Sequence, residues 1–441
     1  MSQHSDLDMP NRETLVAATS APMPRWVTLV SGAFAVIGVI VFIIGAIAGN
    51  DRVWHALQFN WLFFASVSQA GVVMVAVQRI TTARWSRPIV RLLEGYVAFL
   101  PVAFLLLILI LLGGKHIFPF WQHAAPVPEK RLYLSVPFLT IRDILLFGIL
   151  TALSVWYIYT CVRLDVGLLP EGGAAWARGI RARMRRGFGE ERREIHSTHS
   201  LQGRISVWLV LLFNFFYIVL AWDLSMSLDM YFQSTMYGWW FYMGAWLAAI
   251  MSWSLLAMWW RRHLEADDYI TEHHFHDLGK LGFAFTAFWG YLTFAQYLVI
   301  WYGNMPEETH WMHLRLIYPW MPATMAVVFL VFVFPFFGLL SRAAKVYLPT
   351  FVLFAGCSVV GMWLLRYIEV YPSLHYESPH ALFGIWEIGV TIGFLGIWGL
   401  CYRAFMDAFP RMRTTLMTSP WRDEVQVPVN PDTMEPLPAH E

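Results

Sequence analysis

The stretch from His276 to Glu308 decides how this sequence folds, and it reads HDLGKLGFAFTAFWGYLTFAQYLVIWYGNMPEE. A polar or charged cluster stands at each end of about twenty mostly apolar residues, long enough for a helix to cross a bilayer. One face of that helix carries a row of polar side chains, spread over about 40° at 100° per residue. The row consists of Thr286, Thr293 and Tyr297, and Asn304 continues it. It suits either hydrogen bonding between packed membrane helices or a polar path across the membrane.

The composition extends the prediction from one span to the whole chain. The 441 residues are 58% hydrophobic and 14% charged, whereas soluble domains carry about 25% charged residues. We therefore expect an all-α polytopic membrane protein. The net charge is only +1, and no stretch suggests binding to nucleic acid.

Hydropathy and flanking signals divide the chain into ten predicted membrane helices. They lie in one transmembrane domain at residues 26–402, between polar tails at 1–25 and 403–441. The first is too long for a signal-peptide core, so we expect it to be retained. The predicted spans are Trp26–Ile47, Phe59–Val77, Tyr96–Leu112, Thr140–Cys161, Val207–Trp222, Gly238–Trp260, Leu278–Trp301, Met321–Leu340, Val346–Tyr367 and Trp386–Tyr402.

The basic residues are segregated by side. Of the 31 lysines and arginines, 23 fall in the two tails and the loops after spans 2, 4, 6 and 8, and five fall in the other loops. The positive-inside rule therefore places both termini in the cytoplasm. We expect the N-terminal tail, and the C-terminal tail from about Arg411, to be unstructured.

The long cytoplasmic loop at residues 162–206 contains apolar residues spaced by four, from Trp176 through Ile180 and Met184 to Phe188. Arginines lie between them. This pattern predicts a basic amphipathic helix that rests on anionic lipid headgroups. A solvated helix that contacts a partner protein fits it equally. The arginines are Arg178, Arg181, Arg183, Arg185 and Arg186.

Cysteine and histidine positions argue against a redox centre in this chain. The three cysteines are far apart, which excludes an iron–sulfur cluster, a structural zinc site and covalent haem attachment. Histidines near the spans lie in loops or at span ends, so no haem ligation is expected. The inward group around His276 and Asp277 suits a helix start better than a metal site. We predict no bound metal.

Acidic residues at the edges of spans are costly to bury and are therefore paired, hydrated or functional. Asp223 directly follows span 5 and Glu387 opens span 10. They could form ion pairs with Arg142 or Arg366, or they could exchange protons in an outward vestibule. On the inward side, Arg91 and Glu94 are spaced for a helical pair.

We therefore predict two sets of site residues, and we assign no catalytic residue. The proton-path candidates are Asp223, Asp229, Glu307, Glu308 and Glu387 outside, Thr286, Thr293 and Tyr297 within the membrane, and His276, Asp277 and Lys280 inside. The structural ion-pair candidates are Arg91, Glu94, Arg142, Arg366 and Glu369.

Several motifs in these segments resemble a known family. The sequence from span 2 to span 10 is similar to the ActF subunits of bacterial alternative complex III. The motifs are WDLSMSLD at 222–229, STMYGW at 234–239, HDLGKL at 276–281, WGY at 289–291, FAQY at 294–297, IWYGNMPEE at 300–308 and PSLH at 372–375.

This resemblance implies a membrane subunit of a quinol:electron-acceptor oxidoreductase in the bacterial cytoplasmic (inner) membrane, with cytochrome c or an oxidase as acceptor. The wider group is the NrfD/PsrC-like family, whose fold is two four-helix bundles plus an extra helix pair. The implied partners are an ActC-like sister membrane subunit, an iron–sulfur subunit and haem c subunits, which hold the redox centres. The implied ligand is a quinone, either menaquinone or ubiquinone, and proton translocation is an implied activity.

Two other functions fit the same sequence. A purely structural subunit would dock the sister quinol-binding chain and the outer haem and iron–sulfur subunits. A secondary transporter would need broken helices near the midplane in two related halves. Only Pro335, in span 8, provides such a break.

Overall fold

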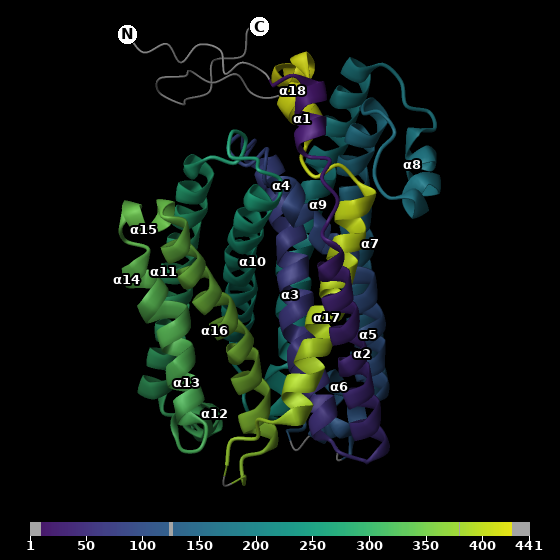
Figure 1. The fold of residues 1–441 in the computed structure, drawn as a ribbon. Coiled ribbons are helices and arrows are strands. Elements are labelled where there is room, and N and C mark those ends of the chain that lie inside the picture. The colour runs from purple at the N-terminus through teal and green to yellow at the C-terminus, as the bar shows by residue number, and fades with distance from the viewer. Residues whose placement is uncertain (1–9, 123–126, 379, 426–441) are drawn as a thin grey trace, which may run out of the picture.

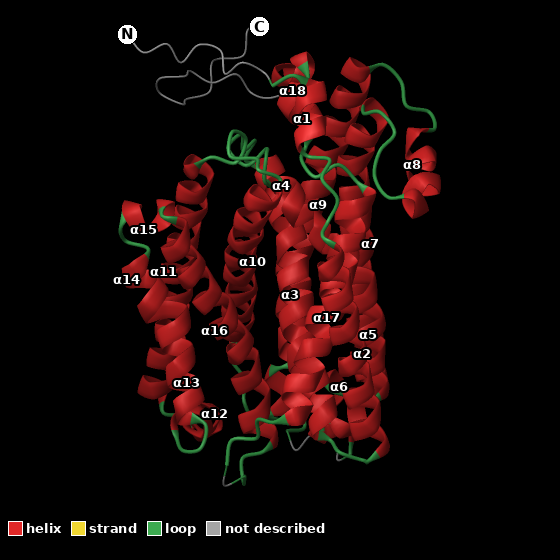
Figure 2. Cartoon of the chain, viewed as in Figure 1, coloured by secondary structure: helices red, strands yellow, loops and turns green. Residues whose placement is uncertain are grey.

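The computed structural model describes residues 10–122, 127–378 and 380–425, which form helices and loops without strands (Figure 1; Figure 2). Ten helices in these ranges are long and apolar enough to cross a membrane, as predicted. They are α2 (Arg25–Ile47), α3 (Arg52–Ile80), α4–η1–α5 (Val90–Leu112), α7 (Val136–Leu168), α9 with η5 (Glu191–Leu228), α10 (Thr235–His263), α11 (Glu272–Gly303), α13–η6–α14 (Met321–Gly338), α16 (Leu348–Leu374) and α17 (Ile385–Ala408).

Two of these spans are divided into segments. The third consists of α4 (Val90–Glu94), a 3-10 turn η1 (Gly95–Phe99) and α5 (Leu100–Leu112). The eighth consists of α13 (Met321–Val327), a π-helical turn η6 (Val328–Val333) and α14 (Phe334–Gly338), where Pro335 lacks the N–H that a regular helix needs. Short elements between spans are α6 (Lys130–Tyr133), α12 (Pro306–Leu316) and α15 (Arg342–Val346), with η2 (Gly114–His116), η3 (Pro119–Trp121) and η4 (Ala175–Ala177). The turn η5 (Met226–Leu228) ends the fifth span, and η7 (Pro420–Val425) follows the last span.

The helices pack in recognisable groups. α3 contacts α5, α7 and α9 in a first set, and α10, α11, α13–α14 and α16 form a second set. The two sets also contact each other, since α10 packs on α3 and α9 and α16 packs on α3. α2 packs along α17 on the outside of the first set (Figure 1). A Cβ added to Gly38 of α2 would lie 2.1 Å from the Cα of Gly393 in α17. Only glycine allows this close backbone approach, which is a common device of membrane helix pairs.

The cytoplasmic loop predicted at 162–206 is mostly helix. α7 continues to Leu168, α9 begins at Glu191, and only the short α8 (Arg178–Arg185) lies between them. The predicted apolar stripe is divided: Met184 is buried, whereas Trp176 and Ile180 are exposed. Met184 therefore packs α8 against the protein, whereas Trp176 and Ile180 remain exposed on its other side.

The expectation of unstructured tails does not hold within the described residues. α1 (Arg12–Ala18) buries Leu15 and contacts α18 (Thr414–Thr418) at the same end of the molecule (Figure 1). Arg12 forms an ion pair of 2.7 Å with Glu191 of α9. Charged side chains of the tails find buried partners, which composition alone does not reveal. Residues 1–9 and 426–441 lie outside the described ranges.

Candidate functional site

The polar row of α11 is only partly enclosed. Thr286 is fully buried, and its hydroxyl has no partner among the described residues. Thr293 donates to the Trp289 carbonyl at 2.8 Å and accepts from the Trp240 indole at 2.9 Å. Tyr297 is 39% exposed and, like Thr293, lines a cavity between α11, α12 and α16. The row thus includes helix–helix hydrogen bonding and ends at this cavity.

The charged groups at the two ends of α11 do not extend this row. On the side that the sequence predicts to be cytoplasmic (the inward side), Asp277 pairs with Lys280 at 2.7 Å, and His276 is half-buried beside them. On the opposite, predicted outward side, Asn304 ends the helix in a left-handed conformation. Glu307 is exposed and Glu308 is half-buried in the first turn of α12. No ion pair or hydrogen bond between described residues links these acids to the row.

A more deeply buried group lies at the outward end of α7. The predicted Arg142–Asp223 pair forms, with the Arg142 Nε donating to Asp223 at 2.7 Å. The Asp143 carboxyl interacts with Asp223, and both side chains are fully buried. Two carboxylates beside one guanidinium leave one negative charge, which a proton can neutralise. Asp229, also predicted here, instead accepts backbone N–H groups in the following loop, including that of Tyr231.

Sequence reasoning missed Asp143, although an acid three residues inside an apolar span is itself a functional signal. Asp143 begins a face of α7 whose members project within about 80° of one another. The face reaches Asp165 after about 33 Å at 1.5 Å per residue, which is roughly the thickness of the hydrocarbon core. Its buried polar members are Asp143, Ser154, Tyr157, Cys161 and Asp165.

Polar groups from α3 and α9 complete the inward half of this face. Gln69 of α3 donates to the Ser154 hydroxyl at 2.8 Å. Gln202 of α9 contacts the Cys161 sulfur at 3.3 Å. In the outward half, two buried apolar residues, Phe147 and Leu150, separate Asp143 from Ser154 by about 16 Å along the helix. Polar side chains therefore recur along the inward half of the face, and apolar residues interrupt it near its outward end.

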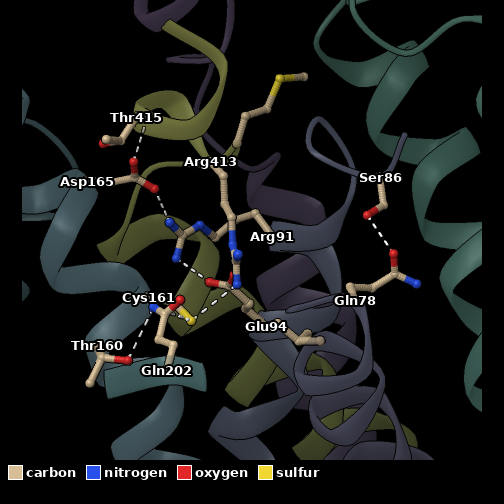
Figure 3. Close-up of polar contacts among 12 residues, drawn as sticks. Gln78, Ser86, Arg91, Glu94, Thr160, Cys161, Asp165, Gln202, Arg413 and Thr415 are labelled. Atoms are coloured by element: carbon tan, nitrogen blue, oxygen red, sulfur yellow. Dashed lines mark hydrogen bonds and ion pairs between the residues drawn. The ribbon is translucent and has the colours of Figure 1, made fainter. Parts of the chain in front are cut away.

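The inward end of the face is a buried network of four charges (Figure 3). The predicted Arg91–Glu94 pair forms, and Arg91 also binds Asp165. Arg413, from the segment after α17, binds Glu94 and contacts the Cys161 sulfur at 3.1 Å. All four charged side chains are at least nine-tenths buried. Two arginines balance two acids, so removal of any one leaves a buried net charge.

Glu387 has a partner that the sequence did not suggest. Arg52, at the start of α3, binds both of its carboxylate oxygens, at 2.9 and 2.8 Å, and the Tyr371 hydroxyl donates to it at 2.7 Å. The expected alternatives, Arg142 and Arg366, bind elsewhere. The guanidinium and carboxylate groups come from α3 and α17, which are far apart in the chain.

Two histidines meet beside this pair. His55 Nδ1 and His375 Nε2 are 3.0 Å apart, and His55 Nε2 lies 2.9 Å from the His116 carbonyl. Since a carbonyl only accepts, His55 donates to it and accepts from His375 when both rings are neutral. Burial, followed by the nearby Arg52 charge, lowers the pKa of His375.

The third outward group borders an apolar cavity. The predicted ion-pair candidates Arg366 and Glu369 pair at 2.7 Å, and Arg315 of α12 donates to the Glu369 carbonyl at 2.8 Å. Burial lowers the pKa of Arg315 to about 10. The cavity, about 340 Å³ in volume, lies between α11, α12, α13–η6 and α16. Its walls are mostly aromatic and aliphatic side chains.

Two buried donors line this cavity. The Trp289 indole N–H and the Gln296 amide N–H have no acceptor among the described residues, and both residues border the cavity. Apolar walls with a few convergent polar groups are typical of cofactor sites.

Across the described residues, no three or more His, Cys, Asp or Glu side chains gather as potential metal ligands. Comparison with protein-family models and with curated proteins finds no match to this chain.

Proposed function

We propose that this chain is the ActF-like membrane subunit of an alternative complex III type oxidoreductase, which supports quinol oxidation and conducts protons. The observation that carries the proposal is the buried face of α7, which holds carboxylates at both ends of a membrane-length helix. Polar groups inside membrane proteins are expensive and mark proton relays among other functions. The packing of α3, α5, α7 and α9, of a second set of four, and of α2 with α17 supports the family fold.

On this proposal, each part of the α7 face has a distinct role. The Asp143–Asp223 pair exchanges a proton on the outward side, while Arg142 holds Asp223 in place. Ser154, Tyr157 and Cys161 offer hydroxyl and thiol groups along the inward half. Phe147 and Leu150 close the route, so protons cross only when water or a side-chain movement bridges them. This closure prevents an uncoupled leak.

The cavity near Arg315 is the proposed quinone site. A quinol, when bound, supplies two electrons and two protons. Trp289 and Gln296 would hold the ring through its oxygens, and the apolar walls would exclude water. Redox centres in the partner iron–sulfur and haem c subunits would have to accept the electrons, since the proposal assigns no redox centre to this chain.

The test compares the two candidate routes in the assembled complex. After reconstitution into vesicles, proton movement per electron is measured during quinol oxidation with a pH-sensitive dye. Asp143→Asn is expected to lower this ratio to about the one proton per electron that quinol oxidation itself releases, because it removes the exchangeable proton from the outward end. Ser358→Ala, a buried hydroxyl of α16 outside the face, is the matched control and should leave the ratio unchanged.

Thr286→Val tests the α11 row in the same assay, because Thr286 lies on the row but does not line the proposed quinone cavity. A loss in Thr286→Val but not in Asp143→Asn would transfer the route to α11. Unchanged proton movement in both variants, together with normal turnover, would favour the purely structural subunit. If this chain did not co-purify with iron–sulfur and haem c subunits, the proposed membership in an alternative complex III type oxidoreductase would be contradicted.

A further inference from the structure

A second cavity lies at the cytoplasmic end of the molecule, beside the Asp165 end of the α7 face. It has a volume of about 450 Å³ and lies where α7 and α17 end, between α8 and the segment that precedes α2. Pro22 and Met23 line it just before α2 begins at Arg25. α2 is one of the most apolar spans, and it begins beside this cavity. The cavity therefore lies at the level of the lipid headgroups.

The lining of this cavity is strongly basic. It contains Arg181, Arg185, Arg403 and Arg411 but only one acid, Asp407. Asp407 lies 3.1 Å from Arg403 and 3.8 Å from Arg411. One carboxylate against four guanidinium groups leaves an excess of positive charge that these side chains do not neutralise among themselves.

Two of the arginines are held in place by the ends of the membrane helices. Arg181 donates to the carbonyl of Ala408, the last residue of α17, at 3.0 Å. Arg185 donates to the carbonyls of Val166 and Leu169 at the end of α7, each at 2.9 Å. Helix C-termini favour cations, so these contacts fix the arginines at the cavity wall.

Donors remain after these contacts are made. The buried Nε groups of Arg181 and Arg411 have no acceptor among the described residues, and both side chains are at least nine-tenths buried. Arginine suits phosphate because its planar fork can donate two parallel hydrogen bonds. Leu169, Met406 and Phe409 supply apolar wall beside these donors.

α8 forms one wall of the cavity, and its opposite side faces away from the rest of the protein (Figure 1). Trp176, just before it, is 61% exposed and Ile180 is 46% exposed. Arg178, Arg183 and Arg186 are also exposed. A basic helix with exposed tryptophan and aliphatic side chains, at the level where spans end, is typical of a helix that lies in the membrane interface.

We propose that this arginine cavity binds the phosphate headgroup of an anionic phospholipid from the cytoplasmic leaflet, with α8 inserted beside it as an interfacial anchor. The apolar wall receives the glycerol and upper acyl region. Trp176 and Ile180 lie among the neighbouring lipids. This site is independent of the quinone cavity and of proton conduction.

The experiment measures lipid binding by the whole chain after delipidation in a neutral detergent. Native mass spectrometry titrates phosphatidylglycerol against phosphatidylcholine of the same acyl length. We expect at least tenfold tighter binding of phosphatidylglycerol. Arg403→Gln should lower that preference at least fivefold, while Arg183→Gln, an exposed arginine of α8 outside the cavity, should leave it unchanged.

Asp407→Asn should have the opposite effect on lipid affinity, because it removes the one carboxylate that competes with phosphate for the arginines. It should tighten phosphatidylglycerol binding, and a weakening would overturn the proposal. Equal affinity for the two lipids would do so as well. Inorganic phosphate that competes with phosphatidylglycerol at similar concentration would identify a soluble phosphate site instead of a lipid site.

The position of α8 is tested by a spin label at Trp176→Cys in nanodiscs that contain phosphatidylglycerol. We expect the label to be more accessible to oxygen than to a water-soluble nickel complex. The reverse accessibility would place α8 in water, where it would serve a soluble partner protein, and would overturn the anchor.

Discussion

Three buried carboxylates in this protein are each stabilised by an ion pair with one arginine. The Arg52–Glu387, Arg142–Asp223 and Arg366–Glu369 pairs each place a guanidinium within 2.9 Å of a buried carboxylate. Removing one member of such a pair costs about 3–5 kcal/mol, because the other charge stays buried and unpaired. These positions are therefore sensitive to substitution whether or not they conduct protons.

His375 should make the stability of the protein depend on pH. Its pKa is lowered in the folded chain, chiefly by burial, whereas the unfolded side chain titrates near pH 6.5. The unfolded state therefore binds more protons as the pH falls. The stabilising contribution is complete above about pH 6.5 and is lost as the pH falls through the lower folded pKa.

Thermal unfolding in detergent between pH 5 and pH 8 measures this effect. One proton is worth about 1.4 kcal/mol per pH unit, and partial exposure of His375 reduces this. His375→Gln, which retains a donor toward His55, should flatten the dependence. His310→Gln, at an exposed position, should not. An identical slope in His375→Gln would contradict the assignment.

Arg413 should be essential to the inward charge network (Figure 3). Arg413→Gln leaves Glu94 and Asp165 with Arg91 alone, so a net negative charge is buried. We expect a loss of about 3–5 kcal/mol in the free energy of unfolding. The exposed Arg186→Gln, which changes the total charge equally, should alter it by no more than about 0.5 kcal/mol. Similar losses in both variants would show that the network is not the cause.

At the scale of elements, α2 depends on glycine for its place in the fold. Most of its surface is exposed, and its contact with α17 is made where Gly38 meets Gly393. Gly38→Leu should force the two helices apart and lower the unfolding free energy by at least about 1–3 kcal/mol. Gly32→Leu is the matched control, because nothing lies within 4 Å of a Cβ added there. The comparison is made by thermal unfolding, and equal melting temperatures would contradict the close crossing.

Comparison of α7 with α11 shows that a polar pattern in the sequence does not predict which helix face is buried. The polar row of α11 is plain in the sequence, yet it ends at Tyr297, which is partly exposed and lines a cavity. The face of α7 contains mostly small or weakly polar groups, and Asp165 was assigned to a loop because the apolar run ends at Cys161. Periodicity identifies a shared face, but it does not reveal which neighbour covers that face.

At the scale of the whole molecule, the ten spans predict that both ends of the chain lie in the cytoplasm. A fluorescent protein fused after residue 441 should be bright, because it folds in the cytoplasm. Alkaline phosphatase inserted near residue 378, between α16 and α17, should be active, because that loop is predicted to be outside. The opposite pattern would reverse the orientation, and reporter signals that place both sites on one side of the membrane would contradict a crossing by α17.

The sequence by itself determined the all-helical class, the number of spans and their approximate positions. These follow from local composition, since a backbone in lipid must satisfy its own hydrogen bonds and an apolar run must match the bilayer thickness. It also predicted ion pairs whose members are near in the chain, such as Arg91 with Glu94.

Only the tertiary structure decided which distant groups meet. Arg52 reaches Glu387, and Arg413 reaches Glu94, across more than three hundred residues each. The same holds for the tails and for the arginine cavity, whose walls come from four separate segments. Such pairings depend on how helices pack side by side. Packing is governed by shape and burial over the whole surface of a helix, and the local sequence does not encode its partner.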